Sequence, residues 1–137
     1  MHKKRYFIAV VLLMVLCIVW IFGQSLLPES SSDSESLRLL ELVHRWFPML
    51  TDVILRKLAH YFEFIVLGVI LSFIPMKRLS TRILIGLLCA LSDETIQMFA
   101  LGRGSLIRDI WIDFVGLLSA LLPIYLIKKY WTLRKEK

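Results

Sequence analysis

Acidic, amide and basic side chains concentrate in one apolar stretch, residues 91–116, and their types suit proton transfer or anion binding. These side chains are Asp93, Glu94, Gln97, Arg103, Arg108, Asp109 and Asp113. A single charge at the centre of a bilayer costs on the order of 3 kcal/mol even on lenient scales. So many charges in apolar sequence predict either mutual pairing or a polar cavity with a function.

A second polar group lies upstream, where Arg56, His60 and Glu63 have the spacing of one helix face. General acid–base catalysis by His60 with Glu63 or Glu94 is the most economical chemistry for these residue types. The candidate acid–base residues are therefore His60, Glu63, Glu94, Asp109 and Asp113. The candidates for binding a substrate are Gln24, Arg56, Asp93, Gln97, Arg103 and Arg108. An arginine fork suits a phosphate or a carboxylate.

Other chemistries have weaker support in the sequence. The same residues offer oxygen and nitrogen ligands, so a divalent metal is an alternative, but only one of them is a histidine and no His-Glu-x-x-His motif occurs, which disfavours zinc. We assign no metal and no other cofactor at this stage. Ser92 and Ser105 lie nearby, but nothing marks either as an activated nucleophile.

The elements that position these residues are predicted to be helices in a membrane. The chain has 137 residues, of which 58% are hydrophobic, and the apolar residues fall in long runs. We expect one all-α domain over residues 1–137, with four transmembrane helices at about 6–22, 53–74, 82–100 and 107–127. Residues 36–50 have an apolar and a polar face, which predicts an outer helix lying in the membrane interface. It either covers the loop backbone or gates a substrate.

The first apolar run must be distinguished from a signal peptide. It follows Lys3, Lys4 and Arg5, as in a signal peptide, but it is longer than the usual ~7–15 residues and no Ala-x-Ala site follows it. We therefore predict that this helix is retained in the mature protein.

The basic residues predict the orientation. They flank the apolar runs near the N-terminus, over residues 77–82 and in the tail from Lys128, which points to anionic lipid and not to nucleic acid. The positive-inside rule places both termini in the cytoplasm of a multi-pass protein. The ionisable side chains of the second, third and fourth helices then converge on one pocket near the outer surface. The sequence leaves the oligomeric state open.

A structural polar clasp is the alternative to a functional pocket. In that interpretation Arg103 and Arg108 pair with Asp109 and Asp113, and Arg56 pairs with Glu63. Hydrogen bonds within membranes contribute only ~0.6 kcal/mol on average, so a clasp of this size is an expensive route to stability. Ionisable residues at membrane depth are therefore treated first as functional candidates.

Two blocks of the sequence resemble the VanZ family. One runs from Arg56 to Phe64 and continues to Leu67-Gly68. The other comprises Asp93, Glu94, Gln97, Phe99, Gly102-Arg103, Asp109, Asp113 and Gly116. Leu101 stands where the family often has proline. The resemblance implies a bacterial plasma-membrane protein connected with resistance to the glycopeptide antibiotic teicoplanin, without implying a mechanism.

Two hypotheses follow for the function. In the first, the protein is a membrane-embedded enzyme that acts on a lipid-linked or anionic cell-envelope substrate at the outer leaflet. In the second, it is an accessory protein that senses or shields such a lipid, or a lipoglycopeptide, without chemistry. A transporter would need polar residues along its whole depth, whereas the inner halves of these helices are apolar.

Overall fold

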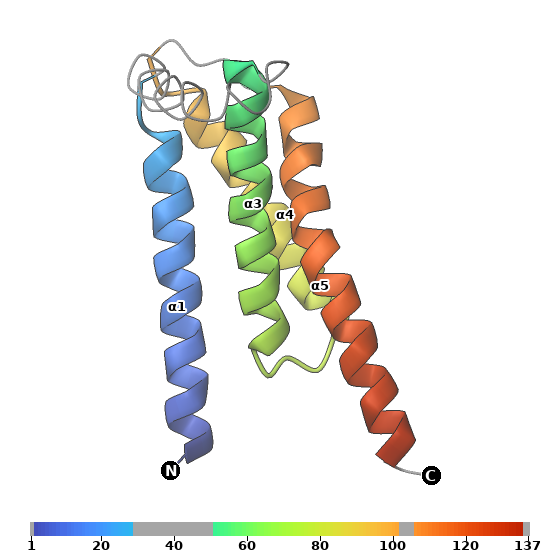
Figure 1. Ribbon diagram of the computed structural model, residues 1–137. Coiled ribbons are helices and arrows are strands. Elements are labelled where there is room, and N and C mark those ends of the chain that lie inside the picture. Colours follow the sequence, from blue (N-terminus) through green and yellow to red (C-terminus); the bar gives the residue numbers. More distant parts are fainter. Residues whose placement is uncertain (1, 29–50, 102–105, 136–137) are drawn as a thin grey trace, which may run out of the picture.

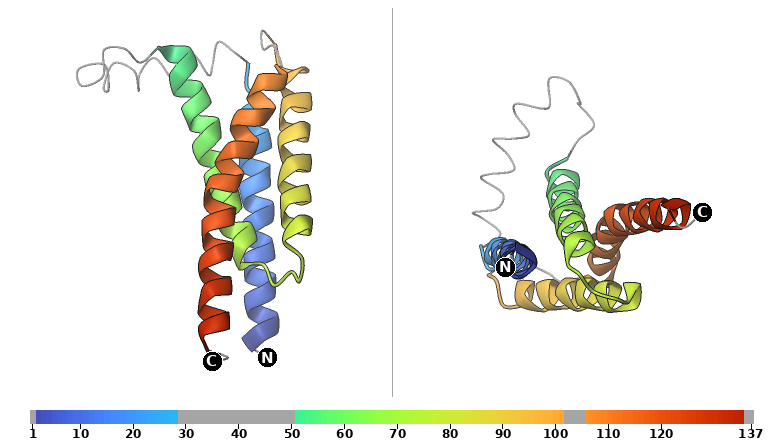
Figure 2. Two further views of the ribbon diagram at one scale, coloured as in Figure 1. Left: turned by 90° about the vertical axis from the view of Figure 1, so that its right-hand side faces the viewer. Right: turned by 90° about the horizontal axis from the view of Figure 1, so that it is seen from below.

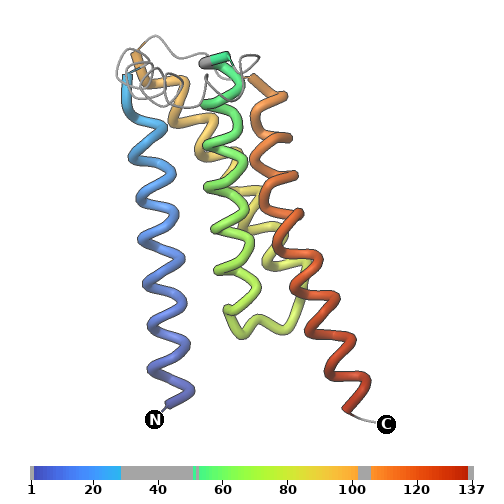
Figure 3. The backbone as a smooth tube through the Cα atoms, viewed as in Figure 1, coloured from blue at the N-terminus to red at the C-terminus, as the bar shows by residue number. Residues whose placement is uncertain are grey.

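The computed structural model describes residues 2–28, 51–101 and 106–135, and this part of the chain is all-helical. Its helices are α1 (His2–Ser25), α3 (Asp52–Phe73), α4 (Leu79–Gln97) and α5 (Ile107–Lys135) (Figure 1). The predicted interfacial helix at residues 36–50 lies outside the described residues. Both ends of the chain lie at the same end of the bundle, as does the connection between α3 and α4 (Figures 1 and 3).

Helices α3 and α4 each contact all of the other described helices, and the most extensive packing is that of α3 against α5. Helix α4 runs obliquely behind α3, and α1 and α5 lie on opposite sides of α3 (Figures 1 and 2). The buried core is formed by Ile21, Phe64, Leu67, Leu71, Ile74, Cys89, Ala90, Leu117 and Leu121. Cys89 thus packs as a small apolar side chain, in keeping with its place in an apolar run.

Small residues bring α3 and α5 into close backbone contact. A Cβ atom on Gly116 of α5 would lie 2.5 Å from the carbonyl oxygen of Tyr61 in α3. A Cβ atom on Gly68 of α3 would similarly meet the backbone of Leu117. Gly86 of α4 faces the Leu117 side chain, so the small residues of α4 also serve its contact with α5. Small residues therefore let α3 and α5 approach each other closely, and Gly86 makes room on α4 for a side chain of α5.

The C-terminal end of α3 is capped by side chains from all of its neighbours. The last carbonyl groups of a helix lack partners inside the helix and need other donors. Here Tyr6 donates to the Phe73 carbonyl over 3.1 Å, and Lys128 donates to the Ser72 carbonyl over 2.8 Å. Arg82 donates to the carbonyls of Ile74 and Met76 over 3.0 and 2.9 Å. At the other end, the Thr51 side chain caps α3 by accepting a 3.4 Å hydrogen bond from the backbone nitrogen of Ile54.

Of the described helices, α1 and α5 are long and apolar enough to cross a membrane by length and composition. Helices α3 and α4 carry more charge near one end, which is the end that builds the pocket. Helix α5 also extends beyond the predicted boundary at residue 127, with Pro123 inside it, and ends at Lys135. Large apolar side chains such as Leu16, Val19 and Leu126 are exposed, each by about 60% or more.

Candidate functional site

A pocket of about 230 Å³ opens between α3, α4 and the start of α5. Its charged and polar lining comes from Arg56, Lys57, His60, Glu94, Gln97, Arg108, Asp109 and Asp113. Val53, Leu106 and Ile112 supply the apolar part of the wall. The helix spacings explain this convergence, because Arg56 and His60, Glu94 and Gln97, and Asp109 and Asp113 each lie one helical turn apart.

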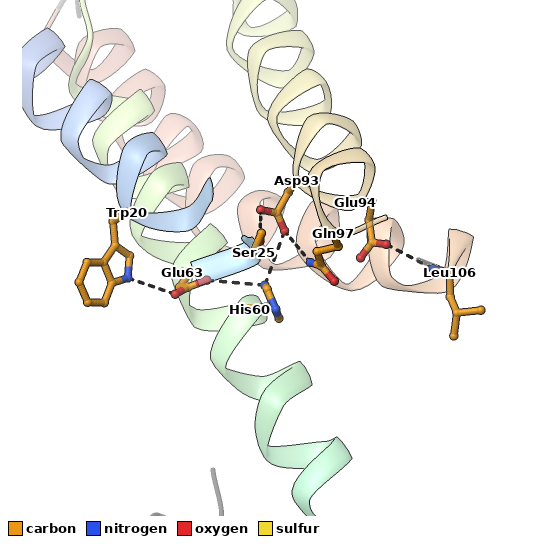
Figure 4. A network of polar contacts seen from close by, with 8 residues as sticks. All are labelled: Trp20, Ser25, His60, Glu63, Asp93, Glu94, Gln97 and Leu106. Atoms are coloured by element: carbon orange, nitrogen blue, oxygen red, sulfur yellow. Dashed lines mark hydrogen bonds and ion pairs between the residues drawn. The ribbon is translucent and has the colours of Figure 1, made fainter. Parts of the chain in front are cut away.

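Asp93 is fully buried, with an exposure of 0%, in a polar network beside the pocket (Figure 4). Its Oδ1 atom accepts a 2.5 Å hydrogen bond from the hydroxyl of Ser25, at the end of α1. Its Oδ2 atom accepts a 3.0 Å hydrogen bond from the Gln97 side chain, one turn along α4. Asp93 therefore connects α1 to α4 through contacts that hold its carboxylate in one orientation.

His60 lies between carboxylates from two helices (Figure 4). Its Nδ1 atom is 3.6 Å from Oε2 of Glu63 in α3 and 3.7 Å from Oδ2 of Asp93 in α4. Glu63 in turn accepts a 3.2 Å hydrogen bond from the indole nitrogen of Trp20 in α1. The imidazole is thus held in an acidic environment at the meeting point of α1, α3 and α4.

Two further carboxylates support the start of α5. Oε2 of Glu94 accepts a 3.2 Å hydrogen bond from the backbone nitrogen of Leu106, just before the helix begins. An anion is favourable at this position because the first backbone N–H groups of a helix point towards it. Asp109, in the first turn of α5, forms an ion pair with Lys57 of α3. Both carboxylates therefore have structural partners in addition to lining the pocket.

Asp113 differs from these carboxylates in its surroundings. Its exposure is 2%, and its Oδ2 atom accepts no hydrogen bond from the residues that the structure describes. The neighbouring groups that act on its charge include the carboxylates of Asp93, Glu94 and Asp109. Burial of an ionised carboxylate without compensation is costly, so binding of a proton or a cation by Asp113 would be favourable.

The structure places most of the predicted site residues together. His60, Glu94, Gln97, Asp109 and Asp113 line the pocket with Arg56 and Arg108, while Glu63 and Asp93 contact His60 from beside it. Gln24 is not among the lining residues, and its neighbour Ser25 makes the contact with Asp93. Arg103 lies outside the described residues.

Three contacts of the site were not singled out by the sequence analysis, namely those made by Trp20, Ser25 and Lys57. Lys57 takes the role that the clasp interpretation gave to an arginine, since it pairs with Asp109. The sequence shows Lys57 directly after Arg56, but it does not show the rotation of α3 that turns Lys57 towards α5. Ser25 follows Gln24 directly, so a shift of one residue separates the prediction from the contact.

The fold and the pocket define a class of protein: all-helical, with exposed apolar side chains and a polar site enclosed between helices. The family follows from comparison with known sequences. The model of the VanZ/LLP1 family matches residues 7–128, which is most of the chain, and the protein belongs to this family. No curated protein and no solved structure matches the chain.

Proposed function

We propose that the protein spans the bacterial plasma membrane four times, with both termini in the cytoplasm and the pocket at the outer leaflet. Family membership, the exposed apolar side chains and the two long apolar helices support a membrane location. The ends of the chain lie at one end of the bundle, as an even number of spans requires (Figure 1). Basic residues gather at that end, and the positive-inside rule then assigns it to the cytoplasm.

The pocket, in this proposal, binds the anionic headgroup of a lipid-linked component of the cell envelope. The observation that carries the proposal is that Arg56, Lys57 and Arg108 line the same small cavity beside His60. Arginine binds phosphate and carboxylate oxygens with two parallel hydrogen bonds, and such bonds are strong where water is largely excluded. A volume of about 230 Å³ suits a headgroup better than a whole drug-sized molecule, which needs ~300 Å³ or more.

Binding without chemistry is the simpler form of this function. Glu94 and Asp109 already hold backbone or lysine partners, and Asp93 accepts two hydrogen bonds. Binding of an envelope lipid in the pocket would shield that lipid and would lower sensitivity to teicoplanin. Teicoplanin resistance is the phenotype with which the family is loosely linked. The second form is catalysis, in which His60 transfers a proton to or from the bound headgroup. The position of its Nδ1 atom beside Glu63 and Asp93 favours that role.

The test compares lipid binding by charge-matched variants. The full chain is reconstituted in nanodiscs of phosphatidylcholine, and binding of added phosphatidylglycerol is measured by native mass spectrometry. The Arg56→Gln/Arg108→Gln double variant should bind at least about tenfold more weakly, which corresponds to ~1.4 kcal/mol. Arg78→Gln/Lys77→Gln removes the same charge at the opposite end and should bind like the wild type. Equal losses in both double variants would show that only net charge matters and would refute the pocket.

A resistance assay separates the two forms of the function. His60→Gln keeps a polar side chain of similar size but cannot exchange protons near neutral pH. If the protein only binds, this variant should retain phosphatidylglycerol binding and teicoplanin resistance at matched protein levels. If it is an enzyme, binding should persist while resistance is lost.

A further inference from the structure

We propose that His60, Asp93 and Asp113 form a site for one divalent cation of the kind that accepts mixed nitrogen and oxygen ligands, such as Zn²⁺ or Mn²⁺. The site would lie where His60 and Asp113 of the pocket wall meet Asp93 beside the pocket, and it would not include Arg56 and Arg108, which we call the rim. The proposal goes beyond headgroup binding and does not depend on it, because metal binding can be measured without any added lipid.

The first support is the convergence of ligand atoms from separate helices. His60, Asp93 and Asp113 come from α3, α4 and α5, and each offers one ligand atom within 4.8 Å of the others. Around a metal with ligand bonds of ~2.1 Å, ligand atoms lie at most about 4.2 Å apart. Three ligand atoms spaced evenly around such a metal lie about 3.6 Å apart or less, so the widest separation must shrink by about 1.2 Å, which rotation of the side chains can supply.

The second support is the spacing around the imidazole. Nδ1 of His60 lies 3.6 Å from Glu63 and 3.7 Å from Asp93 (Figure 4). Both separations exceed the ~2.7–3.2 Å of an N–H···O hydrogen bond. Neighbouring ligands of a tetrahedral zinc ion with ~2.1 Å bonds lie about 3.4 Å apart. The spacing therefore resembles that of ligands sharing an ion, and Glu63 is placed as a further oxygen donor.

The third support is the buried carboxylate of Asp113. Its Oδ2 atom is enclosed and accepts no hydrogen bond from the described part of the chain. Asp113 belongs to the same cluster as His60 and Asp93. Carboxylates surround it, since Asp93, Glu94 and Asp109 all act on its charge. A divalent cation bound between Asp93 and Asp113 would neutralise both buried charges at once.

The fourth support is the set of groups that hold the ligands in place. The hydroxyl of Ser25 and the side-chain amide of Gln97 both donate to Asp93. Hydrogen bonds of this kind orient metal-binding carboxylates in known sites and commonly affect metal affinity by 10- to 100-fold. This arrangement revises our sequence-based expectation of no metal. A search for closely spaced histidines misses a site whose ligands come from different helices.

The test measures metal on the purified full chain in detergent, carrying an affinity tag without histidines. The protein is stripped with a chelator, incubated with Zn²⁺ or Mn²⁺, freed of excess ion by gel filtration and analysed by elemental mass spectrometry. The wild type should retain about one ion per chain. Asp113→Asn should bind at least tenfold more weakly. Asp109→Asn makes the same change one turn earlier on α5, where the carboxylate pairs with Lys57 and acts on Asp113 through its charge without belonging to the cluster, so its loss of binding should be clearly smaller.

Two results would overturn the proposal. One is a wild type that retains no more metal than Asp113→Asn, and the other is an equal loss in Asp109→Asn. X-ray absorption of the zinc-loaded wild type provides a measurement that needs no variant, in case Asp113→Asn does not fold. A spectrum with one imidazole nitrogen and oxygen neighbours supports the site, and a spectrum with oxygen neighbours alone refutes it. Failure of these tests leaves the lipid-binding proposal intact, because its arginines belong to the rim.

Discussion

The hydroxyl of Ser25 donates a 2.5 Å hydrogen bond to Oδ1 of Asp93, joining the end of α1 to a carboxylate with 0% exposure. Both side chains are buried, and the two residues are 68 positions apart in the sequence. The contact makes α1 a component of the site, although only Ile21 and Ser25 of this helix are buried.

Removal of this contact should destabilise the protein. We expect Ser25→Ala to lower the free energy of unfolding by about 1.5–3 kcal/mol, because it deprives a buried carboxylate of a hydrogen-bond donor. Thermal unfolding in detergent measures the loss. Ser119→Ala is the matched control, since that hydroxyl only bonds the Gly116 carbonyl of its own helix. A loss for Ser25→Ala no larger than for Ser119→Ala would contradict the assigned role.

The close approach of α3 and α5 should make Gly116 sensitive to any added side chain. In Gly116→Ala the new methyl group would lie 2.5 Å from the Tyr61 carbonyl oxygen, so the helices must separate. Overpacking of this kind costs ~1–3 kcal/mol. Gly23→Ala should be tolerated, because a Cβ atom there meets nothing within 4 Å. The melting temperatures of the two variants in the same detergent provide the comparison, and equal values would refute the prediction.

The first helix should be present in the mature protein. Trp20 and Ser25 near its end contact Glu63 and Asp93, so removal of the helix would open the polar network. Intact mass of protein purified from membranes tests this directly. A species beginning near Gly23 or Gln24 would show that the helix is cleaved.

The topology should be visible by labelling single cysteines in intact cells. In a background with Cys17 and Cys89 replaced by alanine, Ser32→Cys should react with a membrane-impermeant thiol reagent and Arg78→Cys should not. The reason is the placement of basic residues at the end of the bundle that includes Arg78. The reverse pattern of labelling would show that the orientation is opposite to the proposed one, with the pocket at the inner leaflet.

The Glu63→Gln variant should distinguish a functional role of the acidic network from a purely structural one. This change keeps an acceptor for the Trp20 indole but removes a negative charge beside His60. If the network only holds the helices together, teicoplanin resistance at matched protein levels should persist. If the pocket works as proposed, resistance should fall while the melting temperature changes little. Loss of folding in this variant would support the structural interpretation alone.

Much of this arrangement could be predicted from the sequence, because helix positions follow from apolar runs and shared faces follow from the helical repeat. This is how His60, Glu94, Gln97, Asp109 and Asp113 could be assigned to one region before the structure. The family resemblance, drawn from the same residues, is confirmed by the match over residues 7–128.

The partners within that region could not be predicted, because they depend on helix rotation and on the distance between helix axes. Lys57 pairs with Asp109, and Ser25 reaches Asp93, and neither contact was assigned from the sequence. Helix α5 also extends beyond its predicted end at residue 127, since Lys128 continues the helix and donates to the Ser72 carbonyl. Each of these outcomes is decided by contacts between segments that are distant in the sequence.

The capping of α3 by its neighbours has a consequence for the order in which the protein is assembled. Tyr6 precedes α3 in synthesis and Arg82 follows it closely, but Lys128 leaves the ribosome only after the other described helices have been made. The Ser72 carbonyl must therefore find another donor, such as a water molecule or a lipid headgroup, until α5 has been inserted. Placement of α5 is then the event that completes the capping of α3, so a chain shortened before Lys128 would leave this end of α3 open.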